Sequence, residues 1–410
     1  MGLTNNNFQK NSNLSRVVET VWRNPGISRI DIARTINLYR STVSNIVGIL
    51  VEKGVILEGK PGESMAQGGR KPVSLSINPK FGCIIGLELY PNQYRIFVID
   101  FEGTELFSRE LKTPNCLVMT SNPEKDFICF VDEVMKDIQP FISELSLPVI
   151  GISCGMPGII DTNKGIIIRS DPFGLEDFNF SEVFDMRYGV PFIAENDANC
   201  CGWLQLAQNK NDVAQDFLAV LARNYGDANH KNTDKTKLNG IGIGIAVVLE
   251  GRIQYGSKFS VGEYLSASWR PENKGQTGLN QQVLNCELND KAAYTIWLRD
   301  FFASLTLLIP VLSPSMVFLH GQNTNKQQLI NYVIEHDVPQ FRGALKKTGT
   351  TFKIIPESPF EIAQGAANMM LQKLFCITDL KQIDSVSAFD WDDIFKLAHR
   401  ERTKASLVKF

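Results

Sequence analysis

The sequence predicts an α/β protein with a small helical domain at its N-terminus and two larger α/β lobes behind it. Three observations predict this order: basic residues concentrate in the first 80 positions, helix-periodic segments fill residues 14–54, and strand-like runs alternate with helical ones from residue 81. At 410 residues the chain is long enough for several domains, each with its own core. The expected divisions are residues 1–80, 81–200 and 201–380, followed by a C-terminal helical segment, 381–410.

Composition indicates a soluble, cytoplasmic protein. Hydrophobic residues make up 43% of the chain and charged residues 21%, as in ordinary globular proteins. We expect no run long enough to span a bilayer, hence no membrane partner, and the polar N-terminus argues against export. The eight cysteines show no paired metal spacing, so we interpret them as reduced thiols.

The net charge of -2 hides a strong asymmetry along the chain. Residues 1–80 hold 11 Lys and Arg against 5 Asp and Glu, a balance of +6, which leaves the remainder at -8. A basic head on an acidic body suggests that the head meets a polyanion.

Three helices are predicted in the head. The first carries its apolar residues on one face between Leu14 and Trp22 and ends before Pro25. Ser28 can cap the second helix. The third begins near Arg40 and ends at Gly54, with apolar residues at i, i+3, i+4 and i+7 spacing: Val43, Ile46, Val47 and Leu50.

After the helices, residues 55–58 and 73–77 are expected to form the two strands of a wing, so the head is predicted to be a winged helix-turn-helix domain. The third helix begins with short hydrogen-bonding side chains that suit base edges and phosphates in a major groove. The loop between the two wing strands ends in two basic residues that suit a minor groove. These candidate DNA-binding residues are Arg40, Ser41, Thr42, Ser44, Asn45, Arg70 and Lys71. The head resembles the DNA-binding domain of bacterial winged-helix repressors. A three-helix protein-interaction module with a solvated basic face is the alternative.

The body reads as two α/β lobes with a cleft between them, an actin-like (RNase H-like) arrangement of the sugar-kinase type. The polar, aperiodic stretch 223–240 is expected to be a mobile insertion in the second lobe. Expected strands are 83–89, 94–101, 105–112, 148–153, 217–222, 241–249, 315–319 and 351–355. Expected helices are 124–143, 197–208, 291–309, 326–337 and 359–374.

Three clusters in the body can carry chemistry. The first is a Gly-Met-Pro-Gly turn ending at Gly158, where glycine lets backbone approach a ligand, although a plain tight turn has the same residues. The second is Asn196-Asp197 at the end of an apolar strand, which suits neighbouring sugar hydroxyls; the alternative is an Asp N-cap for the next helix. The third runs from Gly240 to Glu263, where glycines could cradle a phosphate and Glu263 could offer a further carboxylate to a polyol.

The winged helix, the Gly-x-Pro-Gly turn, Glu-Asn-Asp-Ala-Asn and the Gly-Glu step, in this order over residues 14–375, resemble the ROK family of repressors and sugar kinases. The resemblance implies that Asn196, Asp197 and Glu263 contact sugar, with Asp197 at the position of the kinases' catalytic base. It also implies a homodimer or homotetramer that releases operator DNA when a sugar or sugar phosphate closes the cleft.

Two departures from the family pattern change this expectation. The kinases' Asp-x-Gly-Gly-Thr phosphate loop is replaced by residues 88–92, where Pro91 lacks a backbone N–H and its neighbours are bulky. Ser266 stands where the family's zinc-binding His belongs, and only Cys286 follows nearby, so no metal and no cofactor are expected. The chain is similar to the zinc-free branch that includes xylose-repressor-like regulators.

The resulting hypothesis is a sugar-responsive transcriptional repressor that binds a pseudo-palindromic operator and is not an enzyme. Two alternatives stay open. One is an ATP-dependent sugar kinase with a DNA-binding domain, in which Asp197 would be the catalytic base. The other is a sugar-independent regulator controlled by a protein partner.

Overall fold

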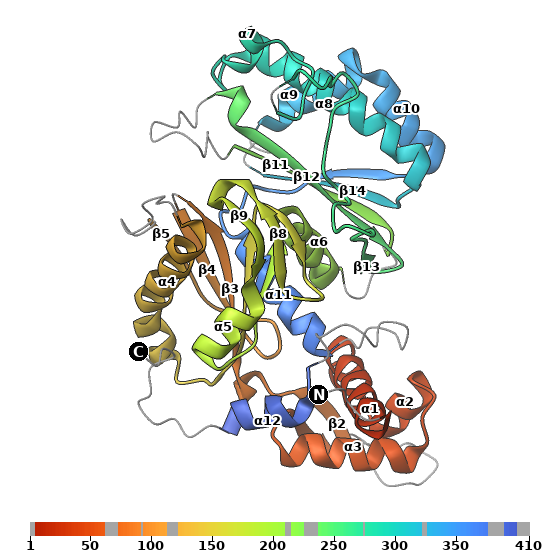
Figure 1. The fold of residues 1–410 in the computed structure, drawn as a ribbon. Coiled ribbons are helices and arrows are strands. Elements are labelled where there is room, and N and C mark those ends of the chain that lie inside the picture. Colours follow the sequence, from red (N-terminus) through yellow and green to blue (C-terminus); the bar gives the residue numbers. More distant parts are fainter. Residues whose placement is uncertain are drawn as a thin grey trace.

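A computed structural model describes residues 5–61, 73–91, 93–112, 122–209, 215–224, 237–273, 275–321, 326–375 and 389–399. Three bodies follow one another along the molecule, with the head at one end, the first lobe in the middle and the second lobe at the other end (Figure 1). The predicted combination of a winged helix-turn-helix domain with a two-lobed α/β domain is confirmed.

The head has the predicted three helices and two-stranded wing. Ser28 caps its second helix as expected, because its Oγ accepts a hydrogen bond from the backbone N–H of Asp31 at 3.3 Å. The apolar residues predicted on the third helix are all buried. The elements are α1 (Asn5–Arg23), α2 (Arg29–Thr35), α3 (Arg40–Glu52), β1 (Ile56–Pro61) and β2 (Val73–Ile77).

The first lobe is built on a five-stranded sheet of order β10-β6-β3-β4-β5. The first three strands form an antiparallel meander, and β6 and β10 add in parallel beside β3. The sheet elements are β3 (Cys83–Tyr90), β4 (Gln93–Asp100), β5 (Glu105–Lys112), β6 (Val149–Met156) and β10 (Phe192–Asn196). The other elements are α4 (Pro123–Leu145), β7 (Ile159–Asp161), β8 (Ile166–Ser170), β9 (Leu175–Asn179), α5 (Phe180–Tyr188) and α6 (Asp197–Gln208).

The second lobe repeats this topology. Its sheet has the order β13-β12-β11-β14-β15, again an antiparallel meander followed by two parallel strands. The doubled arrangement is the actin-like architecture predicted from the alternating strands and helices. The strands are β11 (Phe217–Asn224), β12 (Ile241–Leu249), β13 (Arg252–Ile253), β14 (Met316–His320) and β15 (Thr351–Ile354). The helices are α7 (Gln281–Leu284), α8 (Lys291–Leu312), α9 (Gln327–Tyr332), a π-helical turn (Val333–Asp337) and α10 (Pro339–Thr348).

Helix α8 corrects the expectation that no apolar run reaches bilayer length, because its length and composition suffice to span one. Its inner side packs on the second sheet through large residues that include Trp297, Phe301 and Phe302. Core helices of globular proteins pass the same test of length and composition, so α8 is weak evidence for a membrane span.

Two helices lie between the sheets of the lobes. Helix α11 (Glu361–Phe375) packs on β3 and β6 of the first lobe, and α6 packs between α11 and the strands β11 and β12 of the second lobe. The sequence division placed α11 in the second lobe, but residues from Ala363 to Phe375 belong to the first lobe's core. Helix α11 therefore returns the chain to the first lobe after the second lobe is complete (Figure 1).

The predicted insertion 223–240 also needs correction. Arg223 and Asn224 continue strand β11 and are buried, while Lys237 forms a β-bridge with Glu287 and Leu238–Gly240 is a 3-10 turn. Residues 225–236 lie outside the described part of the chain. The polar side chains concealed the strand end because their burial depends on partners distant in the sequence: Arg223 pairs with Glu88 of the other lobe, and Asn224 Nδ2 donates to the Lys237 carbonyl.

The C-terminal segment contributes helix α12 (Trp391–His399), which packs against the head and the first lobe. The indole N–H of Trp391 donates to Ser15 Oγ at 2.8 Å, and its backbone N–H donates to Asn11 Oδ1 at 3.2 Å. Trp391 is buried against α1, so α12 holds the first helix of the head in place.

Candidate functional site

Asn196 and Asp197 form the corner where β10 enters α6. Asn196 is the N-cap of α6: its Oδ1 accepts from the backbone N–H groups of Ala198 and Asn199, at 2.9 and 3.2 Å. The predicted alternative gave this role to Asp197, but Asp197 is instead the first helical residue and accepts from the N–H of Ala198 at 2.8 Å. The capping bonds occupy the Asn196 oxygen, so we expect its amide group to hold the corner rather than to carry most of a ligand's hydrogen bonds.

Gly158 supports the same corner. Its carbonyl accepts from Asn196 Nδ2 at 2.9 Å, and its φ of +149° is a conformation that suits glycine. A Cβ at this position would lie 2.5 Å from the carbonyl oxygen of Arg169. The close backbone approach expected here therefore serves Asn196 and strand β8.

Glu263 reaches the same region from the second lobe, so the structure brings two of the predicted sugar-binding carboxylates together. Partial burial, followed by the negative charge of Asp197, raises the pKa of Glu263, and Arg169 opposes the shift. The side chain of Glu263 is still open to solvent, whereas Asp197 is buried. Two carboxylates from different lobes can accept hydroxyl hydrogens from one polyol.

Glu263 is held in place by the glycine before it. Gly262 has φ +92°, its carbonyl accepts from Ile245 N at 3.0 Å, and Glu263 bridges to Gly244 on β12. A Cβ on Gly262 would lie 1.8 Å from the Ile245 oxygen. The expectation that Gly240, Gly242 and Gly244 start a phosphate-cradling turn is wrong for Gly242 and Gly244, because both are paired residues inside β12, and Gly244 makes room for Ala198 of α6.

Gly262→Ala is expected to destabilise the protein by at least about twice as much as Gly251→Ala. Both substitutions place alanine at a positive φ, which costs roughly 1–2 kcal/mol, but only Gly262 also meets backbone. A Cβ on Gly251 has nothing within 4 Å, so it is the matched control. Equal shifts of the two melting temperatures would show that the Ile245 contact does not constrain the Glu263 turn.

Sequence reasoning missed the role of Glu195, the residue before Asn196. Its buried carboxylate accepts from Asn196 N at 2.8 Å, Asn199 Nδ2 at 3.1 Å, Trp203 Nε1 at 3.2 Å and the Tyr255 hydroxyl at 2.6 Å. Tyr255 follows β13, so this carboxylate joins the second lobe to the β10–α6 corner. The available sequence signal was a glutamate inside an apolar strand, because a buried carboxylate needs hydrogen-bond donors around it.

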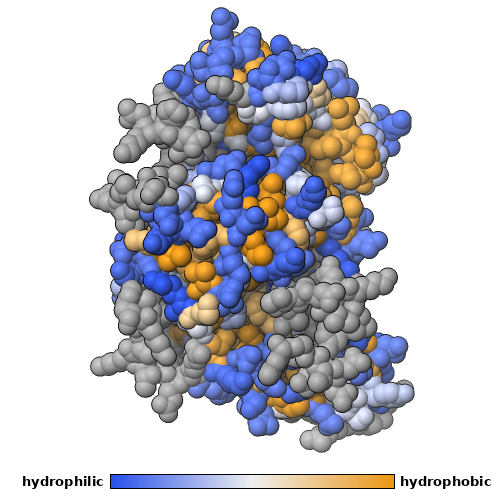
Figure 2. All heavy atoms as spheres, in the orientation of Figure 1, coloured by the Kyte–Doolittle hydropathy of each residue, from blue (hydrophilic) through white to orange (hydrophobic). Residues whose placement is uncertain are grey.

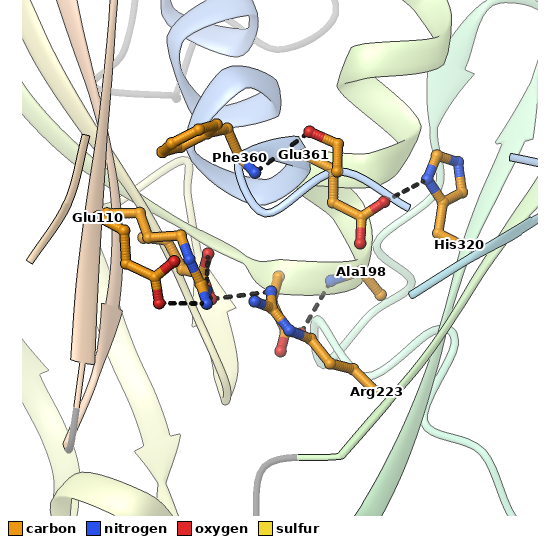
Figure 3. Close-up of polar contacts among 10 residues, drawn as sticks. Glu110, Ala198, Arg223, His320, Phe360 and Glu361 are labelled. Carbon is orange, nitrogen blue, oxygen red and sulfur yellow. Dashed lines mark hydrogen bonds and ion pairs between the residues drawn. The ribbon is translucent and has the colours of Figure 1, made fainter. Parts of the chain in front are cut away.

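A buried ion cluster joins the lobes at the position of the altered phosphate loop. Arg223 Nη1 of β11 lies 2.8 Å from Glu88 Oε1 of β3, and both side chains are 3% exposed. Arg95 lies 2.9 Å from Glu88 and 3.1 Å from Glu110. Figure 3 shows Arg223 reaching from the second lobe toward the sheet that carries Glu110.

The cluster borders a cavity of about 270 Å³ between the lobes, which Glu357 and Glu361 also line. The hairpin there is tight, because Tyr90 pairs directly with Gln93 and only two residues separate them along the chain. The second of these, Asn92, lies outside the described residues. Because this hairpin holds Pro91, which has no backbone N–H, it cannot offer a continuous run of N–H groups to a nucleotide's phosphates.

Ser266, which stands at the position of the family's zinc-binding His, takes part in hydrogen bonds with its neighbours. Ser266 Oγ lies 3.0 Å from Ser268 Oγ and accepts from Gly278 N at 3.2 Å. Cys286 donates to the carbonyl of Gln282 at 3.2 Å.

The start of α3 presents most of the predicted DNA-binding residues on the surface. Arg40, Ser41, Ser44 and Asn45 are exposed and Thr42 is half-buried, while Arg70 and Lys71 lie outside the described residues. Sequence reasoning missed Tyr39, the N-cap of α3, whose side chain is 85% exposed. The available signal was an aromatic residue directly before the polar start of the predicted third helix.

Comparison with known proteins finds matches for both parts of the chain. A profile of the ROK family matches residues 85–264, and a profile of winged helix-turn-helix DNA-binding domains matches residues 10–56. The xylose repressor of Staphylococcus xylosus is 25% identical over 350 residues, which cover 82% of this chain and 77% of that protein. The xylose repressor of Caldicellulosiruptor bescii is 24% identical over 260 residues, 63% of this chain and 59% of that protein, so the match spans less than two thirds of the relative.

Among solved structures, a ROK family transcriptional regulator described as a homolog of the E. coli MLC protein matches with a TM-score of 0.69. The match covers 95% of this chain and 99% of that one at 15% identity. A likeness at this identity shows the fold, including the order of head and lobes.

Proposed function

This chain carries a ROK family domain behind a winged helix-turn-helix domain, and from this premise we propose that it is a DNA-binding repressor of carbohydrate-utilisation genes. A sugar or sugar phosphate bound between the lobes would control its affinity for the operator. The observation that carries the proposal is that Asp197 and Glu263, from different lobes, lie close enough to interact electrostatically while the polar start of α3 stays exposed.

Helix α11 offers a physical connection between these two places. At its first residue, Glu361 lies 3.1 Å from His320 of the second lobe. At its last residue, Phe375 packs edge-on against Trp22 of α1 with ring centroids 5.5 Å apart, and Leu374 accepts from Ser15 Oγ at 3.3 Å. A change in lobe arrangement would therefore reach the head through one helix.

Sugar binding changes DNA affinity only if the sugar binds two arrangements of the protein unequally. A sugar held by both Asp197 and Glu263 meets this condition, because the distance between these residues depends on the lobe arrangement. The curated relatives named above are xylose repressors, so xylose is the first sugar to test. Because Ser266 replaces the family's zinc-binding His, the sugar specificity of zinc-containing members need not apply, so the panel also includes other pentoses and hexoses.

The rival function, an ATP-dependent sugar kinase, rests on Asp197 at the kinases' catalytic-base position. The tight β3–β4 hairpin and the Glu88–Arg223 pair argue against it, because they occupy the place where phosphates would bind. We therefore propose that the chain is not an enzyme. ATP turnover in the presence of a sugar, lost in Asp197→Asn, would support the kinase instead.

We also propose that the repressor acts in the cytoplasm as a homodimer or homotetramer on a pseudo-palindromic operator. The second lobe supports an interface between copies, since Figure 2 shows hydrophobic residues gathered on its surface near α8. The large exposed apolar residues of this helix are Ile296, Leu307 and Val311. Sedimentation at several protein concentrations measures the oligomeric state.

Arg40→Ala is expected to weaken operator binding and to lower the slope of log affinity against log salt by about 1, because one phosphate contact is lost. Glu52→Gln, at the far end of the same exposed helix surface, is the control and should leave the slope unchanged. Fluorescence anisotropy at several salt concentrations measures both. If the two variants behave alike, the start of α3 does not contact DNA.

A thermal-shift screen with sugars and sugar phosphates tests the proposed effector. A binder raises the melting temperature by mass action. Specific operator binding with no response to any sugar in the panel would favour a regulator controlled by a protein partner.

A further inference from the structure

Three potential metal ligands from three separate elements converge between the lobes. Cys201 lies on α6, His320 ends β14, and Glu361 begins α11. Their ligand atoms all lie within 4.8 Å of one another, and each side chain is buried. Figure 3 shows Glu361 and His320 directed toward each other across the boundary between the lobes.

The distances suit one metal ion. His320 Nδ1 and Glu361 Oε2 are 3.1 Å apart. Two ligands at about 2.0–2.1 Å from a tetrahedral zinc ion are about 3.3 Å apart, so little movement is required. The Cys201 sulfur lies within 4.8 Å of the other two ligand atoms. Because a Zn–S bond is about 2.3 Å long, the sulfur has to move only a short way to bind the same ion.

The chemistry of the three ligands also suits zinc. Thiolate, imidazole and carboxylate are its protein ligands, and a thiolate disfavours calcium and magnesium. One divalent ion with one thiolate and one carboxylate is electrically neutral, which a buried site requires. The ion would replace a hydrogen bond that joins a buried carboxylate to a buried imidazole.

Gln205 provides the outer contact that zinc-binding histidines usually have. Its side-chain amide lies 3.4 Å from His320 Nε2, the nitrogen that points away from Glu361. When a metal holds Nδ1, the other ring nitrogen carries a proton and needs an acceptor, which the amide oxygen of Gln205 supplies after rotation of the amide group.

We propose that Cys201, His320 and Glu361 bind one zinc ion that fastens β14 of the second lobe to helices α6 and α11. Binding releases the thiol proton of Cys201 to solvent, and the imidazole proton moves from Nδ1 to Nε2. Of the three ligands, Glu361 lines the cavity between the lobes. This site is separate from Asn196, Asp197 and Glu263, and its ligands differ from the cysteine-rich zinc motif that the chain lacks.

The consequence for the protein is mechanical. Cys201 lies one helical turn beyond Asp197 on α6, and Glu361 begins the helix that ends against the head. A zinc ion at their junction would restrict movement of both helices relative to the second lobe. The site therefore deepens the proposed function, yet zinc binding can be measured without DNA or sugar.

The test uses the full chain, dialysed against a chelator and titrated with cobalt(II) as a spectroscopic substitute for zinc. We expect one equivalent of cobalt to give a thiolate-to-metal charge-transfer absorption band that zinc abolishes. Cys201→Ser should remove the band and lower zinc affinity by more than about tenfold. Cys200→Ser is the matched control, because it removes a neighbouring buried thiol from the same helix and should keep the band.

His320→Gln provides a second variant if Cys201→Ser fails to fold, and it should shift the cobalt spectrum and weaken binding. An unmodified chain that takes up no cobalt and no zinc at stoichiometric concentrations would overturn the proposal and leave a hydrogen-bonded cluster. Equal loss of the band in Cys200→Ser and Cys201→Ser would overturn it as well. Failure of operator binding would not bear on it, so the two proposals fail separately.

Discussion

Glu88→Gln is expected to lower the free energy of unfolding by about 3–5 kcal/mol, because it leaves two buried guanidinium groups without their shared carboxylate. Glu88 lies 2.9 Å from Arg95 and 2.8 Å from Arg223, and all three side chains are at most 5% exposed. Arginine keeps its charge in any protein environment, so the protein cannot relieve the cost by deprotonation. Urea unfolding followed by circular dichroism measures the change.

Glu110→Gln is the matched control for this substitution. Glu110 lies 3.1 Å from the same Arg95, but its side chain is 50% exposed, so the loss should be under about 1 kcal/mol. The double variant Glu88→Gln/Arg223→Gln should recover part of the stability, because it removes a charge together with its partner. If Glu88→Gln is no more destabilising than Glu110→Gln, the cluster does not hold the lobes together.

Asp197→Asn is expected to give a repressor that still binds its operator but no longer responds to sugar. The asparagine Oδ1 can keep the hydrogen bond from Ala198 N, so the corner should fold as before. A hydrogen bond to a charged group contributes about 1.5–3 kcal/mol, which corresponds to roughly 10- to 100-fold in sugar affinity. Calorimetry with the sugar found in the thermal-shift screen measures the loss.

Asp185→Asn is the control for this change. It is an acid-to-amide substitution in the same lobe, and its carboxylate also accepts from a backbone N–H, that of Phe192 at 2.5 Å. Sugar affinity should be unchanged in this variant. The charge of Asp197 raises the pKa of Glu263, so Asp197→Asn should also lower the pKa of Glu263. Full sugar affinity in Asp197→Asn would exclude this carboxylate from the site.

Much of the fold could be predicted from local patterns. The expected strands and helices between residues 83 and 375 correspond to observed ones, because buried strands read as apolar runs and helices as 3.6-residue periods. The Ser28 cap was predictable for the same reason, since its hydrogen bond involves a residue three positions away. Short elements such as β7, α5 and α10 were missed, because few residues carry their periodicity.

Contacts between distant segments could not be predicted. Arg223 was taken for part of a polar insertion because its burial depends on Glu88, which lies in another lobe. Helix α11 was placed in the second lobe because chain order does not reveal that it returns to pack on β3. The cluster of Cys201, His320 and Glu361 has no motif, since each residue comes from a different element.

The candidate sugar site was partly predictable. The Glu-Asn-Asp motif and the Gly-Glu step pointed to Asp197 and Glu263, which the structure brings within electrostatic range of each other. The division of roles within the motif was not predictable: Asn196 caps α6, and Glu195 gathers donors from both lobes. Hydrogen-bond partners, rather than residue types, distinguish these roles.

The most direct test of the central claim, that the chain is a sugar-responsive DNA-binding repressor, is one titration. The full chain is mixed with a labelled DNA site that it has itself selected from random sequences, and binding is followed by fluorescence anisotropy with and without each sugar of the panel. The account predicts sequence-specific binding whose affinity changes at least several-fold with one sugar and does not change with that sugar in Asp197→Asn. Failure to select any DNA sequence would contradict it.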